Sequence, residues 1–453
     1  MKKIFCIFAA VIGCFIFVSC GVRGADVSEY AVPEYADGIR MDIGACFGPP
    51  VADYHGYSAD KFNQARFDEM AAAGFNTLFP GGWLNGTQGD GYNMARCAQM
   101  LDYAEKAGIG VWLGDFNLCN YRYGNIKITA DFDKYIAHPA VLGNLLCDEP
   151  SVSDFDDLTV LYNEYKKHSG GKKGFINLYP SYADAAKTGA NYENYAGGFM
   201  GAVQPDMLSY DHYPLFKDER SDGAVIVRDS YFTDMETIRH TAKKYGVPVH
   251  NYIQAVEHLA YPVLTEKAFR WQIAADQAFG ITSFTYFTYW TPDVTGYDNA
   301  LVKLDGTLTP QYGFAKTVNS EVLAWDHVYL RYEWQGTAAV NGSDGDPYGL
   351  LFALKHAKYP DGIEGISSIK SDGDLLCGIF ADADGNKGFM LTNASNPYKE
   401  KSASVSVRFD KPYKGVQVFE KGVPRIIKLD NRGGAVIGLE PGEGKFIIPL
   451  KKK

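Results

Sequence analysis

Cysteine is scarce in this sequence of 453 residues, and its spacing carries no metal or disulfide pattern. Three of the eight cysteines fall within the first twenty residues. The others, an odd number, are widely spaced, with no C-x-x-C pair and no cysteine–histidine cluster: Cys46, Cys97, Cys119, Cys147 and Cys377. A zinc site and a disulfide scaffold are therefore excluded, and we expect buried free thiols and no metal.

Positively charged residues are fewer than negatively charged ones: the sequence has 44 Lys and Arg and 54 Asp and Glu, for a net charge of −10. This balance argues against nucleic acid and an anionic membrane surface as partners. No predicted strand is followed by a G-x-G-x-x-G turn, which disfavours a dinucleotide-binding sheet, and we expect no cofactor. An apolar fraction of 46% is that of an ordinary globular chain, long enough for about two domains.

Long hydrophobic runs are missing except at the start of the chain. Lys2 and Lys3 precede the apolar run Ile4–Val18, which is the pattern of a signal peptide. The tetrapeptide F-V-S-C that ends at Cys20 resembles a bacterial lipobox, which implies lipidation of Cys20. We expect a lipoprotein-type signal peptide over 1–20, a tether over 21–37 and a folded part outside the cytoplasm, lipid-anchored to a bacterial membrane at the cell surface or the periplasmic face. An uncleaved anchor helix is the alternative.

After residue 38, apolar runs with strand character alternate eight times with amphipathic helical stretches. The predicted strands are Ile39–Phe47, Asn76–Pro80, Gly110–Phe116, Gly143–Cys147, Gly174–Tyr179, Asp206–Tyr213, Val247–Ala255 and Ile281–Tyr289. Eight β-then-α units in about 290 residues match the length and order of a TIM barrel. We expect a (β/α)8 TIM barrel over 38–343, with an open doubly wound sheet as the competing arrangement.

From about residue 344 the helical periodicity gives way to short alternating segments separated by turns. The predicted strands there are Leu375–Ala381, Lys387–Asn393, Ala403–Phe409, Gly415–Glu420, Ala435–Leu439 and Gly444–Ile448. We expect an antiparallel β-sandwich over 344–453, with a packing role.

The stretch Gly143–Pro150, G-N-L-L-C-D-E-P, joins a buried strand to a pair of carboxylates. Its apolar run suits a parallel strand, and Pro150 ends that strand by removing a ladder donor. Asp148 and Glu149 thus fall at the carboxyl end of a predicted barrel strand, where such barrels keep their active sites. Capping of the next helix is the plain alternative, although Ser151 already serves that purpose.

The other strand ends carry carboxylates, amides, imidazoles and aromatic rings. Such groups suit a neutral ligand with many hydroxyls, because carboxylates and amides bond hydroxyl groups and aromatic faces stack on sugar rings. A carbohydrate substrate is therefore expected. In chain order the further candidates are Asp42, Trp83, Asp115, Asn117, Asn177, Tyr179, Tyr210, Asp211, His212, Tyr213, His250, Tyr252, Gln254, Glu257, Tyr286 and Trp290.

Residues 39–325 resemble the (β/α)8 glycoside hydrolases, in particular the clan that includes the family 42 β-galactosidases. In that clan a Glu followed by Pro at the end of strand four is the general acid/base, which Glu149-Pro150 matches. The resemblance implies cleavage of O-glycosidic bonds in an oligo- or polysaccharide, with retention through a second Glu at the end of strand seven. Here Gln254 occupies that place, Glu257 lies three residues on, and Asp148 replaces the usual Asn.

The adjacent acids also resemble the pair of the substrate-assisted hexosaminidases, in which the acetamido group of the substrate is the nucleophile. The run Met207–Asp211 with Trp290 is similar to the chitinase-type arrangement. Because neighbouring strand residues point to opposite faces, both acids act together only where the strand end is irregular. The nucleophile is thus expected among Glu257, Asp211 and a substrate acetamido group. A transglycosylase and an inactive carbohydrate-binding barrel are the alternatives.

Overall fold

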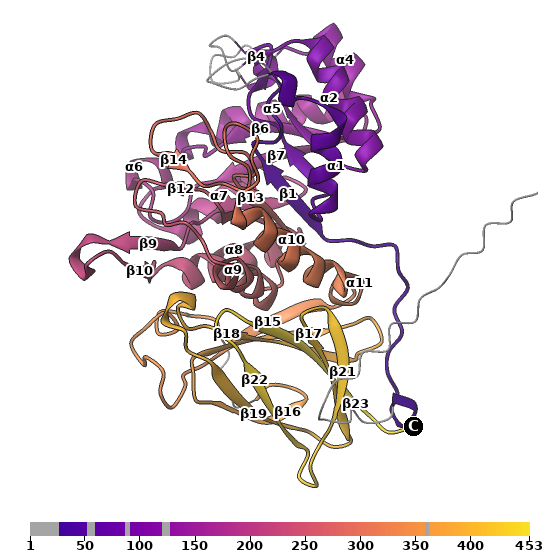
Figure 1. Cartoon of the computed structure of the whole chain (residues 1–453), viewed down its shortest axis with the longest axis vertical. Helices are drawn as coiled ribbons and strands as arrows, with labels where there is room; N and C mark the ends of the chain where they lie inside the picture. Colours follow the sequence, from indigo (N-terminus) through magenta and orange to yellow (C-terminus); the bar gives the residue numbers. More distant parts are fainter. Residues whose placement is uncertain (1–26, 52–58, 87–90, 120–126, 358–361) are drawn as a thin grey trace, which may run out of the picture.

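The structure is a computed structural model that describes residues 27–51, 59–86, 91–119, 127–357 and 362–453. A barrel is followed along the chain by a domain of antiparallel sheets (Figure 1). Within the described ranges, no helix is both long and apolar enough to cross a bilayer. The expected signal peptide over 1–20, with Cys20, lies outside the described residues.

Eight parallel strands close into a barrel in the spatial order β1-β13-β11-β8-β7-β6-β5-β2. They are β1 Asp42–Cys46, β2 Thr77–Phe79, β5 Gly110–Gly114, β6 Val141–Asp148, β7 Lys173–Leu178, β8 Leu208–Asp211, β11 Val249–Gln254 and β13 Ser283–Phe287. Each strand overlaps one of the eight predicted runs, so the predicted (β/α)8 barrel is confirmed. Parallel strands are buried on both faces, so apolar residues are frequent enough in them to mark the strands in the sequence.

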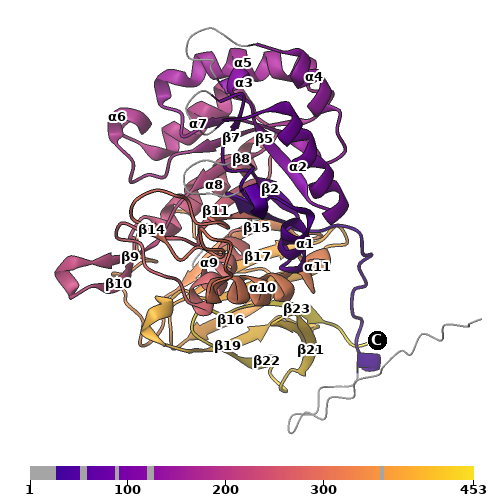
Figure 2. The same ribbon diagram turned by 45° about the horizontal axis from the view of Figure 1, so that its top comes forward.

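Helices alternate with these strands and cover the outside of the barrel (Figure 2). They are α1 Gln64–Ala72, α2 Met94–Ala107, α3 Phe116–Cys119, α4 Ala130–Ile136, α5 Phe155–His168, α6 Ala185–Thr188, α7 Tyr192–Val203, α8 Tyr231–Tyr245, α9 Glu266–Ala278, α10 Pro310–Leu323 and α11 Asp326–Tyr329. Local signals set their ends: the Asn93 side chain caps α2 by accepting from the Arg96 N–H at 3.0 Å. Gly108 then ends α2 in the left-handed conformation, with φ 71°.

The segments between the main elements contain short strands and 3-10 turns. Two-stranded sheets pair β3 Trp83–Leu84 with β4 Gly91–Tyr92, β9 Leu215–Asp218 with β10 Ala224–Val227, and β12 Glu257–His258 with β14 Tyr297–Asp298. Single 3-10 turns are η2 Ala59–Lys61, η4 Val152–Asp154, η5 Glu219–Ser221 and η6 Pro397–Lys399. The β9–β10 pair projects from the side of the barrel in both views (Figures 1 and 2).

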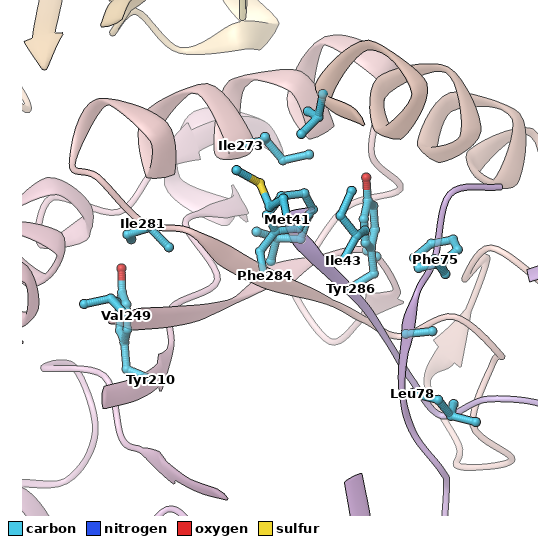
Figure 3. Close-up of a cluster of buried hydrophobic side chains, with 14 of the residues drawn as sticks. Met41, Ile43, Phe75, Leu78, Tyr210, Val249, Ile273, Ile281, Phe284 and Tyr286 are labelled. Atoms are coloured by element: carbon cyan, nitrogen blue, oxygen red, sulfur yellow. The ribbon is translucent and has the colours of Figure 1, made fainter. Parts of the chain in front are cut away.

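The main core lies between the barrel strands and the surrounding helices, and Figure 3 shows part of it. Tyr286 of β13 packs there against Phe75, with ring centroids 5.2 Å apart, and Tyr210 of β8 belongs to the same buried cluster. The Tyr286 hydroxyl donates to the Asn319 side chain of α10 at 2.8 Å. Tyr210 and Tyr286, which we expected to bind substrate, are therefore core residues, because alternate residues of a barrel strand face the helices.

The C-terminal domain is built from a six-stranded sheet, β15-β17-β18-β23-β20-β21, and a three-stranded sheet, β16-β19-β22. The strands are β15 Glu333–Val340, β16 Ile366–Ser371, β17 Leu375–Ala381, β18 Lys387–Asn393, β19 Ala403–Phe409, β20 Gly415–Glu420, β21 Val423–Lys428, β22 Gly434–Leu439 and β23 Gly444–Leu450. A second buried cluster takes side chains from both sheets, so the predicted antiparallel sandwich is confirmed. Its first strand, β15, precedes the boundary expected at residue 344.

The six-stranded sheet packs against the outer helices of the barrel, chiefly α9 (Figure 1). The Thr392 hydroxyl of β18 donates to the Ala274 carbonyl oxygen of α9 at 2.9 Å. The Thr337 hydroxyl of β15 donates to the Ala278 carbonyl oxygen at the same distance. Gly378 of β17 lies so close to the end of α9 that an added Cβ would overlap the Ala278 carbonyl oxygen. Small residues thus allow the sheet and the helix backbone to meet closely.

Residues 27–41, here called the N-terminal strap, run from the sandwich to the start of β1 (Figures 1 and 2). The strap begins with η1 Val27–Glu29, and the Ala31 N–H donates to the Lys451 carbonyl oxygen at 3.0 Å. Tyr30 is 1% exposed, and the Tyr35 hydroxyl donates to Asp382 at 2.8 Å. The described part of the expected tether therefore packs on the sandwich instead of being a free linker.

Candidate active site

A cavity of about 400 Å³ lies at the carboxyl ends of the barrel strands. Each of the eight strands contributes a residue at or near its end: Cys46, Phe79, Gly114, Asp148, Asn177, Asp211, Tyr252 and Phe287. Connecting segments add Phe47, Trp83, Glu149, Tyr213, His258 and Tyr297, among others. The lining therefore combines carboxyl groups, an amide and many aromatic rings.

The end of β6 is irregular, and this irregularity brings two neighbouring acids to the same cavity. The pairing of β6 with β7 shifts register between Leu145 and Cys147, as in a β-bulge. Glu149 then adopts a left-handed φ of 50°, which is uncommon for a residue other than glycine, and its N–H donates to the Asn177 carbonyl oxygen at 2.8 Å. Asp148 and Glu149 consequently both line the cavity, although neighbours in a regular strand would face opposite sides.

Asn177 connects the two aspartates of the cavity. Its Nδ2 donates to Asp211 Oδ1 at 2.9 Å and to Asp148 Oδ1 at 3.3 Å. Asp211 is 8% exposed. The Asp148 side chain is exposed to the cavity, but the protein atoms around it still remove it from bulk water. Removal from bulk water raises the pKa of both carboxyls, and the nearby Glu149 and Asp148 raise that of Asp211 further. Full ionisation of carboxyl groups this close together is costly.

Glu149 has the protonation behaviour of a general acid. Burial, and secondly the charge of Asp148, raise its pKa to about 7, with a partial opposing effect of Lys187. The exposed Lys187 ammonium donates to the Tyr179 hydroxyl at 2.9 Å, so Tyr179 positions this lysine near Glu149. A carboxyl group with such a pKa keeps its proton near neutral pH and can give it to a leaving oxygen.

Aromatic rings form much of the cavity wall and floor. Trp83 of β3 packs on Gly114 at the end of β5, where an added Cβ would lie 2.5 Å from the indole ring. His258 stacks on Tyr297 with ring centroids 4.6 Å apart and an interplanar angle of 11°. Flat rings of this kind suit the C–H faces of a sugar. Of the predicted site residues, the cavity is lined by Trp83, Asp148, Glu149, Asn177, Asp211, Tyr213 and Tyr252.

Gln254 and Glu257 lie away from the cavity lining, which corrects their expected place. The buried Gln254 side chain bonds both backbone groups of Leu215, with Oε1 accepting at 3.1 Å and Nε2 donating at 3.0 Å. Glu257, on β12, pairs with Lys217 Nζ at 3.2 Å and accepts from Asn299 Nδ2 at 2.8 Å. The strand β11 ends at Gln254, and Glu257 is already the first residue of the next strand, β12.

Three polar candidates from the first and third strands have structural positions. Asp42 is the first residue of β1 and so lies at the amino end of the barrel, because the strand begins three residues later than Ile39. Asp115 is fully buried, and it accepts from the Tyr135 hydroxyl and from the Asn117 N–H, each at 3.0 Å. Asp115 and Asn117 thus shape the segment after β5 instead of lining the cavity.

The candidate histidines and Trp290 are also internal. His212 Nδ1 lies 2.8 Å from Asp234 Oδ2, and burial lowers the pKa of this imidazole. His250 is inside the barrel, beneath the cavity lining, and it is 4% exposed. Trp290 is 1% exposed, and its Nε1 donates to the Leu304 carbonyl oxygen at 3.4 Å. The chitinase-type placement expected for Trp290 is therefore not found.

The lining residues that were not predicted include five aromatic ones: Phe47, Phe79, Trp112, Phe287 and Tyr297. Phe79 and Trp112 belong to an interior cluster and stack with centroids 6.0 Å apart. Their strands were predicted correctly, so the available signal was their position near the strand ends. Tyr297 lies on the short strand β14 after β13, and nothing local in the sequence marks it.

One group of side chains in the described ranges brings ligand atoms together as a metal site requires, namely Asp102 and Glu105 of α2 with His138. His138 Nδ1 accepts from the Ala140 N–H at 3.2 Å, so the neutral ring carries its proton on Nε2. That proton faces Asp102 Oδ1 at 3.6 Å and Glu105 Oε2 at 3.8 Å. These distances are those of ion pairs and are longer than hydrogen bonds, and the group lies at the surface, with His138 just before β6.

A scan against protein-family models finds no match, and a comparison with curated proteins finds none either. Among solved structures, the chain is similar to a β-galactosidase from the psychrophilic Marinomonas ef1, with 12% identity and a TM-score of 0.47 over 64% of this chain and 60% of that one. It is also similar to a putative α-galactosidase from Bacteroides fragilis, with 8% identity and a TM-score of 0.47 over 91% and 80%. It is similar as well to an endo-β-1,4-mannanase from Thermotoga petrophila, with 12% identity and a TM-score of 0.41 over 88% of this chain and 97% of that one. The matched region thus spans less than two thirds of the Marinomonas enzyme.

Proposed function

We propose that this chain is a glycoside hydrolase that cleaves an O-glycosidic bond, with Glu149 as the general acid. The observation that carries the proposal is the position of Glu149 in an aromatic-lined cavity at the strand ends, with a pKa of about 7. The Glu149-Pro150 motif of the family 42 clan supports it. In the first step the Glu149 proton passes to the glycosidic oxygen, the bond from that oxygen to the anomeric carbon breaks, and its electron pair stays with the departing alcohol.

Asp211 is the carboxylate of the cavity that we propose as the protein nucleophile, in place of Glu257. It lies at the end of β8, shares Asn177 with Asp148 and is close enough to Glu149 for their charges to interact. Attack of its oxygen on the anomeric carbon would give a covalent glycosyl-enzyme. Water would then hydrolyse that intermediate while Glu149 takes up the proton, with net retention.

A substrate-assisted N-acetylhexosaminidase is the second candidate, and the bulged end of β6 favours it. Both acids of the Asp148-Glu149 pair reach the same cavity there, which is the geometry that substrate assistance requires. Burial holds the pKa of Asp211 well above its usual range, and this disfavours an ionised Asp211 nucleophile. In this mechanism Asp148 would accept the acetamido N–H while the acetamido oxygen attacks the anomeric carbon.

Hydrolysis of chromogenic glycosides, with and without a 2-acetamido group, tests the proposal. We expect Glu149→Gln to lower turnover by at least about a hundredfold, as loss of a general acid does. Glu257→Gln is the matched control, since it makes the same change outside the cavity and should retain activity. Cleavage restricted to acetamido sugars and lost in Asp148→Asn would identify substrate assistance. Trapping of a covalent adduct on Asp211 would identify the protein nucleophile.

No cleavage of any glycoside or polysaccharide by the wild type, combined with sugar binding measured by calorimetry, would replace the hydrolase with a carbohydrate-binding barrel. A transglycosylase would instead show transfer of the glycosyl group to an added sugar acceptor in preference to water. The products of the same reactions, separated by chromatography, distinguish these outcomes.

We also propose that the chain is exported and lipid-anchored through Cys20. The lipobox-like F-V-S-C sequence supports this proposal. Metabolic labelling with a fatty acid in a bacterial host tests it. Wild-type protein should incorporate label and sediment with membranes, and Cys20→Ser should do neither. Label in the Cys20→Ser variant would contradict the proposal.

A further inference from the structure

We propose that Ser209 and His250 are positioning residues that fix the side-chain amide of Asn177, so that its nitrogen faces the two aspartates of the cavity. The functional part of this inference rests on the proposed hydrolase. The structural part concerns the order of protons in a chain of hydrogen bonds and can be measured without any substrate.

The chain of hydrogen bonds runs through the interior of the barrel from β13 to β6. Thr285 Oγ1 lies 2.8 Å from His250 Nε2, and His250 Nδ1 lies 3.0 Å from Ser209 Oγ. Ser209 Oγ donates to Asn177 Oδ1 at 2.9 Å. Asn177 Nδ2 then donates to Asp211 and, on the far side, to Asp148. Four neighbouring strands thus connect to β6 through consecutive side chains.

In this chain of hydrogen bonds, the donor in one bond determines the donor in the next. A serine hydroxyl has one proton, and Ser209 gives it to Asn177 Oδ1, so Ser209 can only accept from His250. His250 must therefore carry its proton on Nδ1 and leave Nε2 to accept from the Thr285 hydroxyl. The opposite order would turn the amide oxygen of Asn177 toward the aspartates, where an ionised carboxylate would repel it.

The surroundings hold the imidazole in this orientation. The His250 ring packs edge to face against Phe175 and Tyr252, with both centroid distances 5.0 Å. Burial lowers the pKa of His250 to about 3, so the ring is neutral near pH 7. Gly44 of β1 leaves room for the Thr285 hydroxyl, which an added Cβ would overlap. The ring is thus neutral, buried and bonded at both nitrogens.

This arrangement gives Asn177 a defined task in the proposed reaction. Its two N–H groups serve Asp211 and Asp148, so the amide stabilises the ionised form of either carboxyl. Without Ser209 the amide could rotate and present its oxygen instead. We therefore expect Ser209→Ala to lower kcat by about tenfold while KM changes little, because the loss falls on the carboxyl groups that act in the reaction.

Nitrogen-15 NMR of histidine-labelled, full-length protein at pH 7 tests the chain, with the His250 signals assigned by their loss in His250→Asn. We expect the Nδ1–H tautomer in the wild type and a changed tautomer balance in Ser209→Ala. Ser283→Ala is the matched control, because the Ser283 hydroxyl donates to the Val249 carbonyl oxygen instead of to this chain. The control should keep both the tautomer and kcat.

An Nε2–H tautomer in the wild type would overturn the inference, whether or not Ser209→Ala folds. An unchanged kcat in a folded Ser209→Ala variant would overturn the functional part. If His250 is the Nδ1–H tautomer but the protein cleaves no glycoside, the inferred order of donors and acceptors stands. Only the proposed hydrolase activity is then contradicted.

Discussion

The raised pKa of Glu149, the proposed general acid, has consequences for both activity and stability. Its pKa of about 7 arises from burial and from Asp148, and both effects oppose ionisation. If the protonated form is the active one, kcat/KM should fall as the pH rises through about 7. A pH–rate profile over pH 5–9 measures this limb, and activity that rises across the same range would contradict the role of acid.

Removing the charge of Asp148 should move that limb. Asp148→Asn keeps the size of the side chain but removes the second cause of the raised pKa of Glu149. We expect the alkaline limb to shift to lower pH, measured on any substrate that the variant still cleaves. A limb at the same pH would show that burial alone sets the pKa of Glu149.

The raised pKa also predicts a pH-dependent stability. The folded chain holds the Glu149 proton more tightly than the unfolded chain, so this group favours folding less as the pH rises from about 4.5 toward 7. Glu149→Gln cannot ionise and should be more stable than the wild type at pH 8, with a smaller difference at pH 5. Thermal unfolding at the two pH values measures this. A less stable variant at pH 8 would contradict the cost assigned to Glu149.

Single positions near strand ends were where the sequence was least informative. Listing polar residues at strand ends found Asn177 and Asp211 but also selected Tyr210 and Tyr286, which face the helices. The direction of a side chain depends on where a strand begins and whether it contains a bulge, and neither follows from composition. The bulge in β6 could be named in advance only as a condition for Asp148 and Glu149 to act together.

At the scale of elements, strand β3 depends on the end of β5. Trp83 rests where Gly114 has no side chain, so Gly114→Ala should push the indole from the cavity wall. We expect KM to rise by about fivefold, the equivalent of ~1 kcal/mol of aromatic contact, with little change in the fold. Trp83→Ala should show a similar effect and Trp83→Phe a smaller one. An unchanged KM in Gly114→Ala would place the sugar elsewhere.

The strands that were predicted and those that were missed differ in a physical way. The barrel strands and β17–β20 contain apolar residues in runs or in alternation that mark their positions, although the predicted bounds differ by a few residues at strands such as β1. β15, β16 and β21 were missed. β15 contains a register shift between Trp334 and Gly336, and β21 is an edge strand that contains Pro424. A bulge and an edge proline both disturb the local pattern that marks a strand.

At the scale of the whole molecule, the barrel and the sandwich should stabilise each other through the contact between α9 and β17. Gly378→Ala would force a methyl group against the Ala278 carbonyl oxygen, and we expect it to lower the free energy of unfolding by ~1–3 kcal/mol. Gly438→Ala is the matched control, because its Cβ would meet open space in the other sheet. Thermal unfolding of both variants measures the difference, and equal Tm values would contradict a tight interface.

The N-terminal strap joins the sandwich to the barrel (Figures 1 and 2). The chain enters β1 at the amino end of the barrel, whereas the cavity opens at the carboxyl ends. Six residues lie between Cys20 and Val27, so the two Cα atoms are at most about 25 Å apart when the segment is fully extended. A lipid on Cys20, as proposed, would therefore lie within this distance of the first residue of the strap, which packs on the sandwich.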